Sequence, residues 1–137
     1  MKTSILTRAL WVAAGSLSMT VAMAADVKLT LTGAQEVPAV TTQATGNGTI
    51  TIGMDNSVSG TITTSGIVGT AAHVHLAAPG KNGPPIITLT KKSDNEWSVP
   101  AGSKLTDEQA ASFKAGDLYV NVHSAANKGG EIRAQLK

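Results

Sequence analysis

The alternation of apolar and polar residues in short runs is the feature that most restricts the fold. In the run 27–31, Val27, Leu29 and Leu31 alternate with Lys28 and Thr30. Successive side chains of a strand point to opposite faces, so a period of two predicts a strand with one buried face. Clusters of Gly, Pro, Asn and Ser separate the runs and favour turns. The pattern predicts short strands over 27–31, 48–52, 58–63, 71–76, 86–89, 97–99, 118–123 and 131–136.

One segment carries helix signals instead. Thr106 and Gln109 have the spacing of a capping box. Asp107 and Glu108 suit the positive end of a helix dipole, and Gly116 is a typical helix stop. We therefore predict one short helix that ends at about residue 115. About eight strands and one helix indicate an all-β fold, either a two-sheet antiparallel sandwich or a partly closed barrel.

The first 24 residues have the features of a secretory signal. Lys2 and Arg8 precede an apolar run over 10–22, which is shorter than a typical membrane span. A small-x-small cleavage pattern ends at Ala24, so we expect the mature protein to begin directly after it. A retained anchor is the alternative. Cleavage would leave one domain, 25–137, in a bacterial periplasm or secreted, with no stable membrane insertion.

The charge and cysteine content of the mature domain exclude several classes of protein. Removal of the signal leaves nine basic and nine acidic residues, so the high isoelectric point of the whole chain gives no argument for nucleic-acid binding. The chain has no cysteine. Disulfides, cysteine-ligated zinc, iron–sulfur clusters and blue copper sites are therefore excluded.

Three histidines lie opposite the apolar rows of two predicted strands. His73 and His75 are two residues apart in the strand 71–76, and His123 closes the strand 118–123. Imidazole is a ligand for copper, zinc and nickel, and copper binds most tightly of the three. The sequence therefore predicts a transition-metal site at these histidines, with copper as the first candidate and zinc as the second.

Other polar residues of the last two strands are expected near this site. Glu131 follows a Gly-Gly turn. If the last two strands form a hairpin, Glu131 falls near His123, as a fourth ligand or as an acceptor for an imidazole N–H. Tyr119, Asn121 and Arg133 share the polar faces of the same two strands. We expect these three side chains to surround the metal ligands.

Five stretches of the chain together resemble the CHRD domain, which was first named in chordin and also occurs as a single secreted domain in bacteria. The stretches are 31–38, 71–76, 83–86, 118–124 and 129–136. Ala77 and Lys128 depart from the family pattern, but both lie in predicted loops. The resemblance implies a Greek-key or immunoglobulin-like β-sandwich. It also suggests protein binding, from the chordin context, without fixing a biochemical role. Gln35 and Glu36, in the first stretch, are expected to order a loop.

Several alternatives to a metal site remain open. The histidines could form a structural hydrogen-bonded cluster, or the domain could be a metal-free protein-interaction module of the cell envelope. The latter predicts an exposed apolar or aromatic patch away from the histidines. The His-x-His strand is also similar to the copper half of Cu/Zn superoxide dismutase, but a fourth histidine, the zinc-binding cluster and the disulfide of that enzyme are missing. The sequence favours a binding module over a redox or hydrolytic metalloenzyme.

Overall fold

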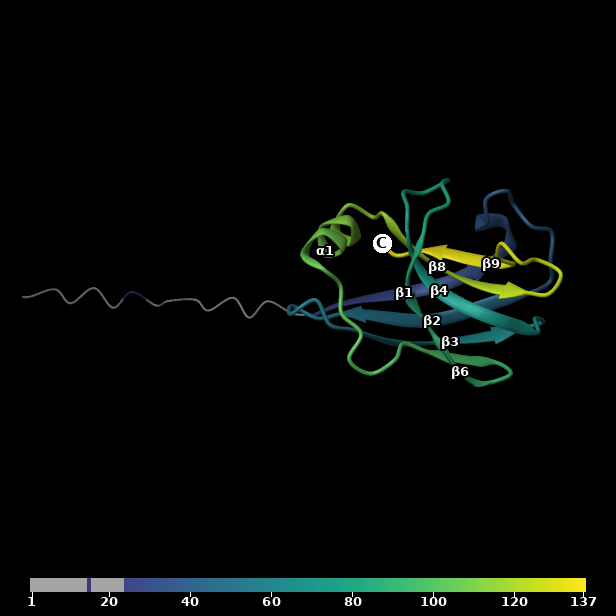
Figure 1. Ribbon diagram of the computed structural model, residues 1–137, viewed down its shortest axis with the longest axis horizontal. Coiled ribbons are helices and arrows are strands. Elements are labelled where there is room, and N and C mark those ends of the chain that lie inside the picture. The colour runs from purple at the N-terminus through teal and green to yellow at the C-terminus, as the bar shows by residue number, and fades with distance from the viewer. Residues whose placement is uncertain (1–14, 16–23) are drawn as a thin grey trace, which may run out of the picture.

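The computed structural model describes residue 15 and residues 24–137, so the predicted signal segment 1–24 lies outside the described residues except at positions 15 and 24. The described chain is built almost entirely of strands (Figure 1). They are β1 (Ala25–Thr32), β2 (Thr45–Ile52), β3 (Val58–Ser65), β4 (Gly69–Leu76), β5 (Pro85–Thr88), β6 (Thr90–Ser93), β7 (Glu96–Ser98), β8 (Leu118–Ser124) and β9 (Ile132–Gln135). A short 3₁₀ helix, η1 (Gly33–Gln35), follows β1, and one α-helix, α1 (Asp107–Lys114), precedes β8.

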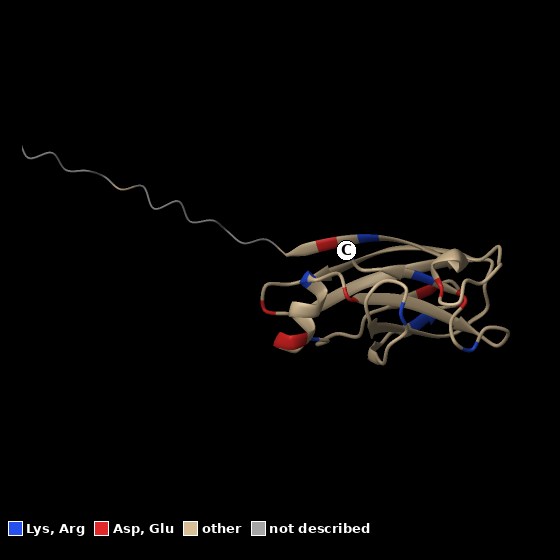
Figure 2. Ribbon diagram, turned by 90° about the horizontal axis from the view of Figure 1, so that it is seen from above, with Lys and Arg blue, Asp and Glu red and all other residues tan. Residues whose placement is uncertain are grey.

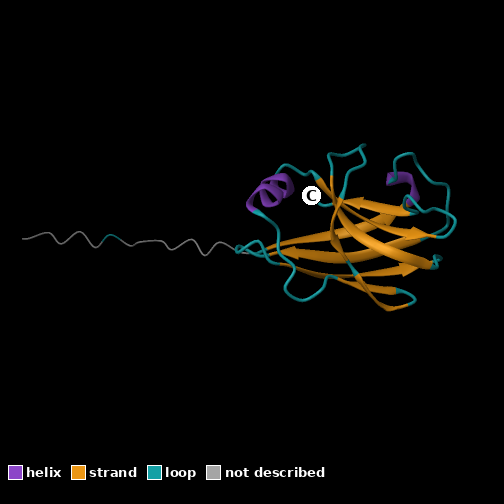
Figure 3. Ribbon diagram, in the orientation of Figure 1, coloured by secondary structure: helices purple, strands orange, loops and turns teal. Residues whose placement is uncertain are grey.

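The strands form one antiparallel sheet in the order β5-β4-β8-β9-β1-β2-β3-β7-β6. The sheet is so strongly curved that its two edge strands, β5 and β6, approach each other (Figure 3). Two observations show this approach: β4 lies beside β6, and the Leu89 N–H, between β5 and β6, donates to Ala72 O at 2.9 Å. The expected all-β antiparallel class with one short helix is therefore confirmed. The hydrogen-bonded order runs unbroken into a nearly closed, barrel-like sheet, so the expected Greek-key or immunoglobulin-like sandwich is not confirmed.

Local sequence signals account for the connections that shape this sheet. Thr106 caps α1 through a complete capping box with Gln109, as predicted. The turn between β2 and β3 contains Asn56 with a φ of 66°, a conformation that asparagine tolerates better than most residues. Strand β6 was not predicted. All four of its residues are exposed, so it has no buried row to produce an alternating pattern.

The apolar rows of the strands meet inside the curled sheet and form the core. Ile50, Ile62, Ala72, Val120 and Val122 have no exposed surface. Trp97 joins the same core at 2% exposure. Burial of side chains of this kind contributes about 1.5–3 kcal/mol each relative to leaving them exposed. The predicted alternation is therefore confirmed for the inward face of the sheet.

The outward face of β4, β8 and β9 is also largely covered, although its side chains are polar. Asn121 and Arg133 are each only 1% exposed. The loops that follow β1 (33–44) and β4 (77–84) rise on this side of the sheet (Figure 1) and are joined by a hydrogen bond from Asn82 Nδ2 to Val37 O at 2.7 Å. The domain thus has a second, polar layer beneath its loops, and this layer contains the predicted site.

Charged residues of both signs are spread over the whole domain (Figure 2). This distribution agrees with the equal numbers of acidic and basic residues after the signal. Within the described residues, no helix has the length and apolar character needed to span a membrane.

Candidate metal centre

The antiparallel pairing of β4 with β8 brings the three histidines together. In this ladder His75 lies opposite Tyr119, His73 lies opposite Asn121, and Ala71 lies opposite His123. Opposed and diagonal side chains on one face of an antiparallel pair are close enough to touch. The ring centroid of His73 lies 5.4 Å from that of His75 and 4.9 Å from that of His123. The centroids of His75 and His123 are 6.0 Å apart. One ring nitrogen from each histidine lies within 4.8 Å of the other two.

Backbone carbonyls of two loops determine which ring nitrogens are free. His75 Nδ1 lies 2.8 Å from Gly83 O, and His123 Nδ1 lies 2.8 Å from Lys128 O. A carbonyl can only accept, so both Nδ1 atoms carry a proton and donate. In the neutral rings each Nε2 then carries a lone pair, which is the tautomer that a metal ion needs. His73 Nδ1 lies 3.0 Å from His123 Nε2 and donates to it.

The surroundings keep two of these imidazoles neutral. Burial lowers the pKa of His73, and the nearby His123 and His75 lower it further. Burial also lowers the pKa of His75, and His123 and Arg133 act in the same direction. The Gly83 carbonyl and the Asn121 side chain partly oppose this by stabilising the protonated form of His75. Metal binding requires neutral imidazole, so these lowered pKa values favour it at neutral pH.

Tyr119 and Arg133 fix the position of His75. The Tyr119 ring stacks on the His75 ring with a centroid separation of 4.7 Å and an interplanar angle of 6°. The Arg133 guanidinium lies over the Tyr119 ring, with Cζ 3.4 Å from its centroid. Arg133 also donates to Lys81 O at 2.8 Å and to Asn82 Oδ1 at 3.1 Å. Arg133 therefore holds the 77–84 loop, whose Gly83 carbonyl orients His75.

Glu131 lies in the loop before β9, but its carboxylate is not among the atoms that converge on the histidines. It accepts hydrogen bonds from Ser124 Oγ at 2.6 Å, Thr42 Oγ1 at 2.7 Å and Asn127 Nδ2 at 3.2 Å. Burial raises the pKa of Glu131, but these three hydrogen bonds together lower it below its ordinary value. Glu131 thus orders the loop that presents the Lys128 carbonyl to His123.

Glu36 belongs to the buried polar layer, whereas the sequence patterns favoured a role in ordering the loop over a place beside the histidines. The side chain is 6% exposed, and Oε1 has no hydrogen-bond partner among the described residues. Burial raises the pKa of Glu36, whereas Arg133 and Asn121 lower it. Its neighbour Gln35 orders the loop as expected, by donating to Thr30 O at 2.9 Å. The presence of a carboxylate in an otherwise loop-forming stretch was the available signal for Glu36.

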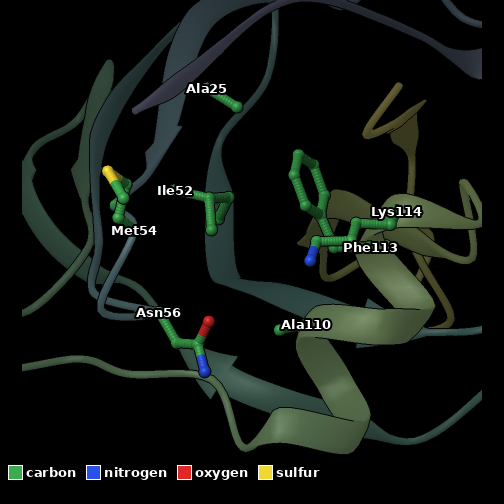
Figure 4. A pocket seen from close by; sticks show the side chains of 8 residues that line it. Ala25, Ile52, Met54, Asn56, Ala110, Phe113 and Lys114 are labelled. Carbon is green, nitrogen blue, oxygen red and sulfur yellow. The ribbon is translucent and has the colours of Figure 1, made fainter. Parts of the chain in front are cut away.

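Two surface hollows differ in what they offer. One opens beside the histidines and is lined by Thr70, Ala71, His73, His123, Ser124, Ala125 and Lys128. The other lies between α1 and the ends of β1 and β2, where Phe113, Ile52, Met54 and Ala110 give it a mainly apolar lining (Figure 4). Only the first contains metal-ligating side chains, so it is the access route to the candidate centre.

Comparison with known proteins identifies one match. The family model of the CHRD domain matches residues 27–136, which is most of the chain and includes every residue of the centre. No curated protein and no solved structure matches the chain.

Replacement of Arg133 tests the role of the buried guanidinium. Arg133→Met should lower the free energy of unfolding by roughly 1–3 kcal/mol, because buried acceptors lose their donors. Arg133→Lys should not restore it, since lysine lacks the planar fork that spans two acceptors and stacks on the ring. Urea unfolding measures both variants, with the exposed Lys28→Met as a matched control. A loss no larger than that of the control would contradict the assigned role.

The lowered pKa values of His73 and His75 predict a pH effect on the metal-free protein. Below the ordinary value of 6.5, the unfolded chain takes up protons at these positions before the folded chain does. Stability should therefore fall as the pH drops from about 7 towards 5 and be level with respect to these groups above about 7. His75→Gln should flatten the decline in urea unfolding with chelator present. The raised pKa of Glu36 makes its own contribution to stability increase as the pH falls. This contribution is common to both proteins, so the difference between their pH slopes reports on His75. An unchanged pH slope in the variant would refute the prediction.

Proposed function

The chain belongs to the CHRD domain family. From the geometry of its histidines we propose that it is an exported binding domain for a transition-metal ion, held by His73, His75 and His123. The observation that supports this function best is the convergence of three ring nitrogens within 4.8 Å. Two nitrogens bound to one ion at about 2.0–2.1 Å are at most about 4.2 Å apart. Side-chain shifts of less than about 1 Å would therefore bring all three nitrogens into bonding distance.

The ligand type supports copper as the first candidate and zinc as the second. Three imidazoles suit both ions, and Cu(II) binds such nitrogen ligands more tightly than Zn(II) or Ni(II). The hydrogen bonds from His75 and His123 to backbone carbonyls are the outer contacts that metal-bound histidines commonly make. Glu131 is not part of the proposed ligand set, since its oxygens already accept three hydrogen bonds.

The metal-free interaction module is less well supported. It predicts an exposed apolar or aromatic patch away from the histidines. In the apolar hollow beside α1, Met54 is exposed, but Ile52 is buried and Phe113 packs against the core. Val68, the other large apolar side chain exposed in the described part of the chain, lies beyond the opposite end of β3, an eight-residue strand of roughly 26 Å, and so does not extend this hollow into a larger patch. Binding rather than catalysis is the activity that three converging imidazoles support by themselves.

Export is the setting that we propose for this function. The expected signal over 1–24 would deliver the domain to the periplasm of a bacterium or to the outside of the cell. A chain without cysteine has no thiol to oxidise there. Imidazole ligands need only be neutral, which the lowered pKa values of His73 and His75 favour at neutral pH.

Titration of the mature domain, 25–137, with Cu(II) and Zn(II) tests the proposal. We expect one ion per chain by calorimetry. At a free metal concentration of 100 times Kd, the ion should stabilise the fold by about 2.7 kcal/mol. That corresponds to a rise in Tm of roughly 10 °C.

Single variants locate the ion. His73→Ala and His123→Ala should each weaken binding by more than about 100-fold, because even outer partners of a metal ligand are worth about 10–100-fold. Asp94→Ala removes a carboxylate that is 96% exposed and serves as the control for casual surface binding. Weak binding at several sites that persists in both histidine variants would assign the cluster to a purely structural role.

A further inference from the structure

We propose that Asn121 supplies the fourth ligand of this centre through its side-chain oxygen, and that this oxygen makes the site selective for Cu(II) and Zn(II) over Cu(I). The inference rests on the proposed function, because it names the ligand set and the class of ion at the same three histidines. Asn121 is a further residue beside the three histidines whose ring nitrogens converge.

Asn121 lies at the centre of the histidine cluster. It stands directly opposite His73 in the β4–β8 ladder, and His75 and Tyr119 form the next pair on the same face. His123 is two residues further on the same strand and therefore also on this face. The side chain of Asn121 is 1% exposed and is covered by the loops, as is His75 at 7%.

The two ends of the Asn121 amide have different surroundings. Nδ2 donates to Gly129 O at 3.3 Å. A Cβ on Gly130 would contact both Asn121 Nδ2 and Glu36 Oε1, so the amide nitrogen and this carboxylate meet at the Gly130 backbone. Gly130 has a φ of 125° and no Cβ, so its backbone can pass close to both groups. The hydrogen bond to Gly129 O thus holds Nδ2 at this end of the amide and directs Oδ1 to the other side.

Oδ1 is the end of the Asn121 amide whose lone pairs are unused. Asn121 and the three histidines project from one face of the β4–β8 pair, and Nδ2 is held at Gly129 O. Within the described residues, Asn121 Oδ1 and His75 Nε2 are both buried and have no hydrogen-bond partner. A buried acceptor without a donor destabilises the fold. One cation that accepts a lone pair from each atom would satisfy both.

An oxygen ligand determines which ions the centre prefers. Cu(I) is a soft ion that is selected by thiolate and thioether ligands, whereas an amide oxygen is hard. Three imidazoles with an amide oxygen complete the four-coordinate shell that Zn(II) adopts in closed sites. Such a shell holds an ion and leaves no position free for a substrate, which agrees with a binding role. We therefore expect a divalent ion as the natural occupant.

Asn121→Leu removes the oxygen while approximately keeping the volume of the side chain. We expect about 30-fold weaker Cu(II) and Zn(II) binding, but less than about 3-fold weaker Cu(I) binding, measured anaerobically by competition with a chelator. Asn47→Leu is the matched control. Asn47 makes the same change of side chain at an exposed position of β2, where its Oδ1 accepts only from Thr30 Oγ1 at 3.4 Å. It should leave all three affinities within about 3-fold of wild type.

The outcomes separate this inference from the proposed function. Unchanged Cu(II) affinity in Asn121→Leu, or an equal loss for Cu(I) and Cu(II), would overturn the ligand role while leaving the three-histidine site intact. Absence of stoichiometric binding in the wild type would overturn both. A measurement on the wild type applies even where Asn121→Leu does not fold. On Zn(II) binding, the ¹³Cγ resonance of Asn121 should shift while the ¹³Cγ resonance of Asn47 stays in place, and an unmoved Asn121 resonance would refute the inference.

Discussion

The register of β4 against β8 is the constraint on which the candidate centre depends. Because side chains alternate, a slip of one residue would turn His123 and Asn121 into the core and bring Val120 and its apolar neighbours to the outside. The apolar side prevents this, since Ala72 and Val74 pack with Val120 in a core that excludes water. The hydrophobic face of the pair thus sets the geometry of its polar face, to within the few ångströms that a metal site requires.

Arg133 links this polar face to the loops that cover it. Its guanidinium is 1% exposed, so its charge acts through a medium that screens it less than water would. The same group holds the 77–84 loop, stacks on Tyr119 and opposes protonation of His75. A buried cation of this kind is costly without acceptors, and the loop backbone supplies them. Burial is the main cause of the lowered pKa of His75, and Arg133 contributes to it both by its charge and by holding the loop over the site.

Alternation predicted the strands other than β6 and the faces of the histidines, and capping residues predicted the helix, because each signal depends on residues near one another in the chain. Closure of the sheet and the position of Glu36 depend on distant contacts, for which no local pattern exists. Glu131 was expected to serve the histidines. However, His123 Nδ1 already donates to Lys128 O, so the ring has no second N–H to offer, and three other donors satisfy the carboxylate instead.

The unpaired atoms of the polar layer connect binding to folding. Loop carbonyls satisfy the Nδ1 atoms of His75 and His123, yet His75 Nε2 and Asn121 Oδ1 are left without donors in a site from which water is largely excluded. Their desolvation lowers the stability of the metal-free fold, and an ion that binds both would remove that cost only in the folded state. The unfolded chain holds no such arrangement, because its four donors come from two strands separated by more than forty residues. In the proposed site, metal affinity and fold stability would therefore be coupled through the same buried lone pairs.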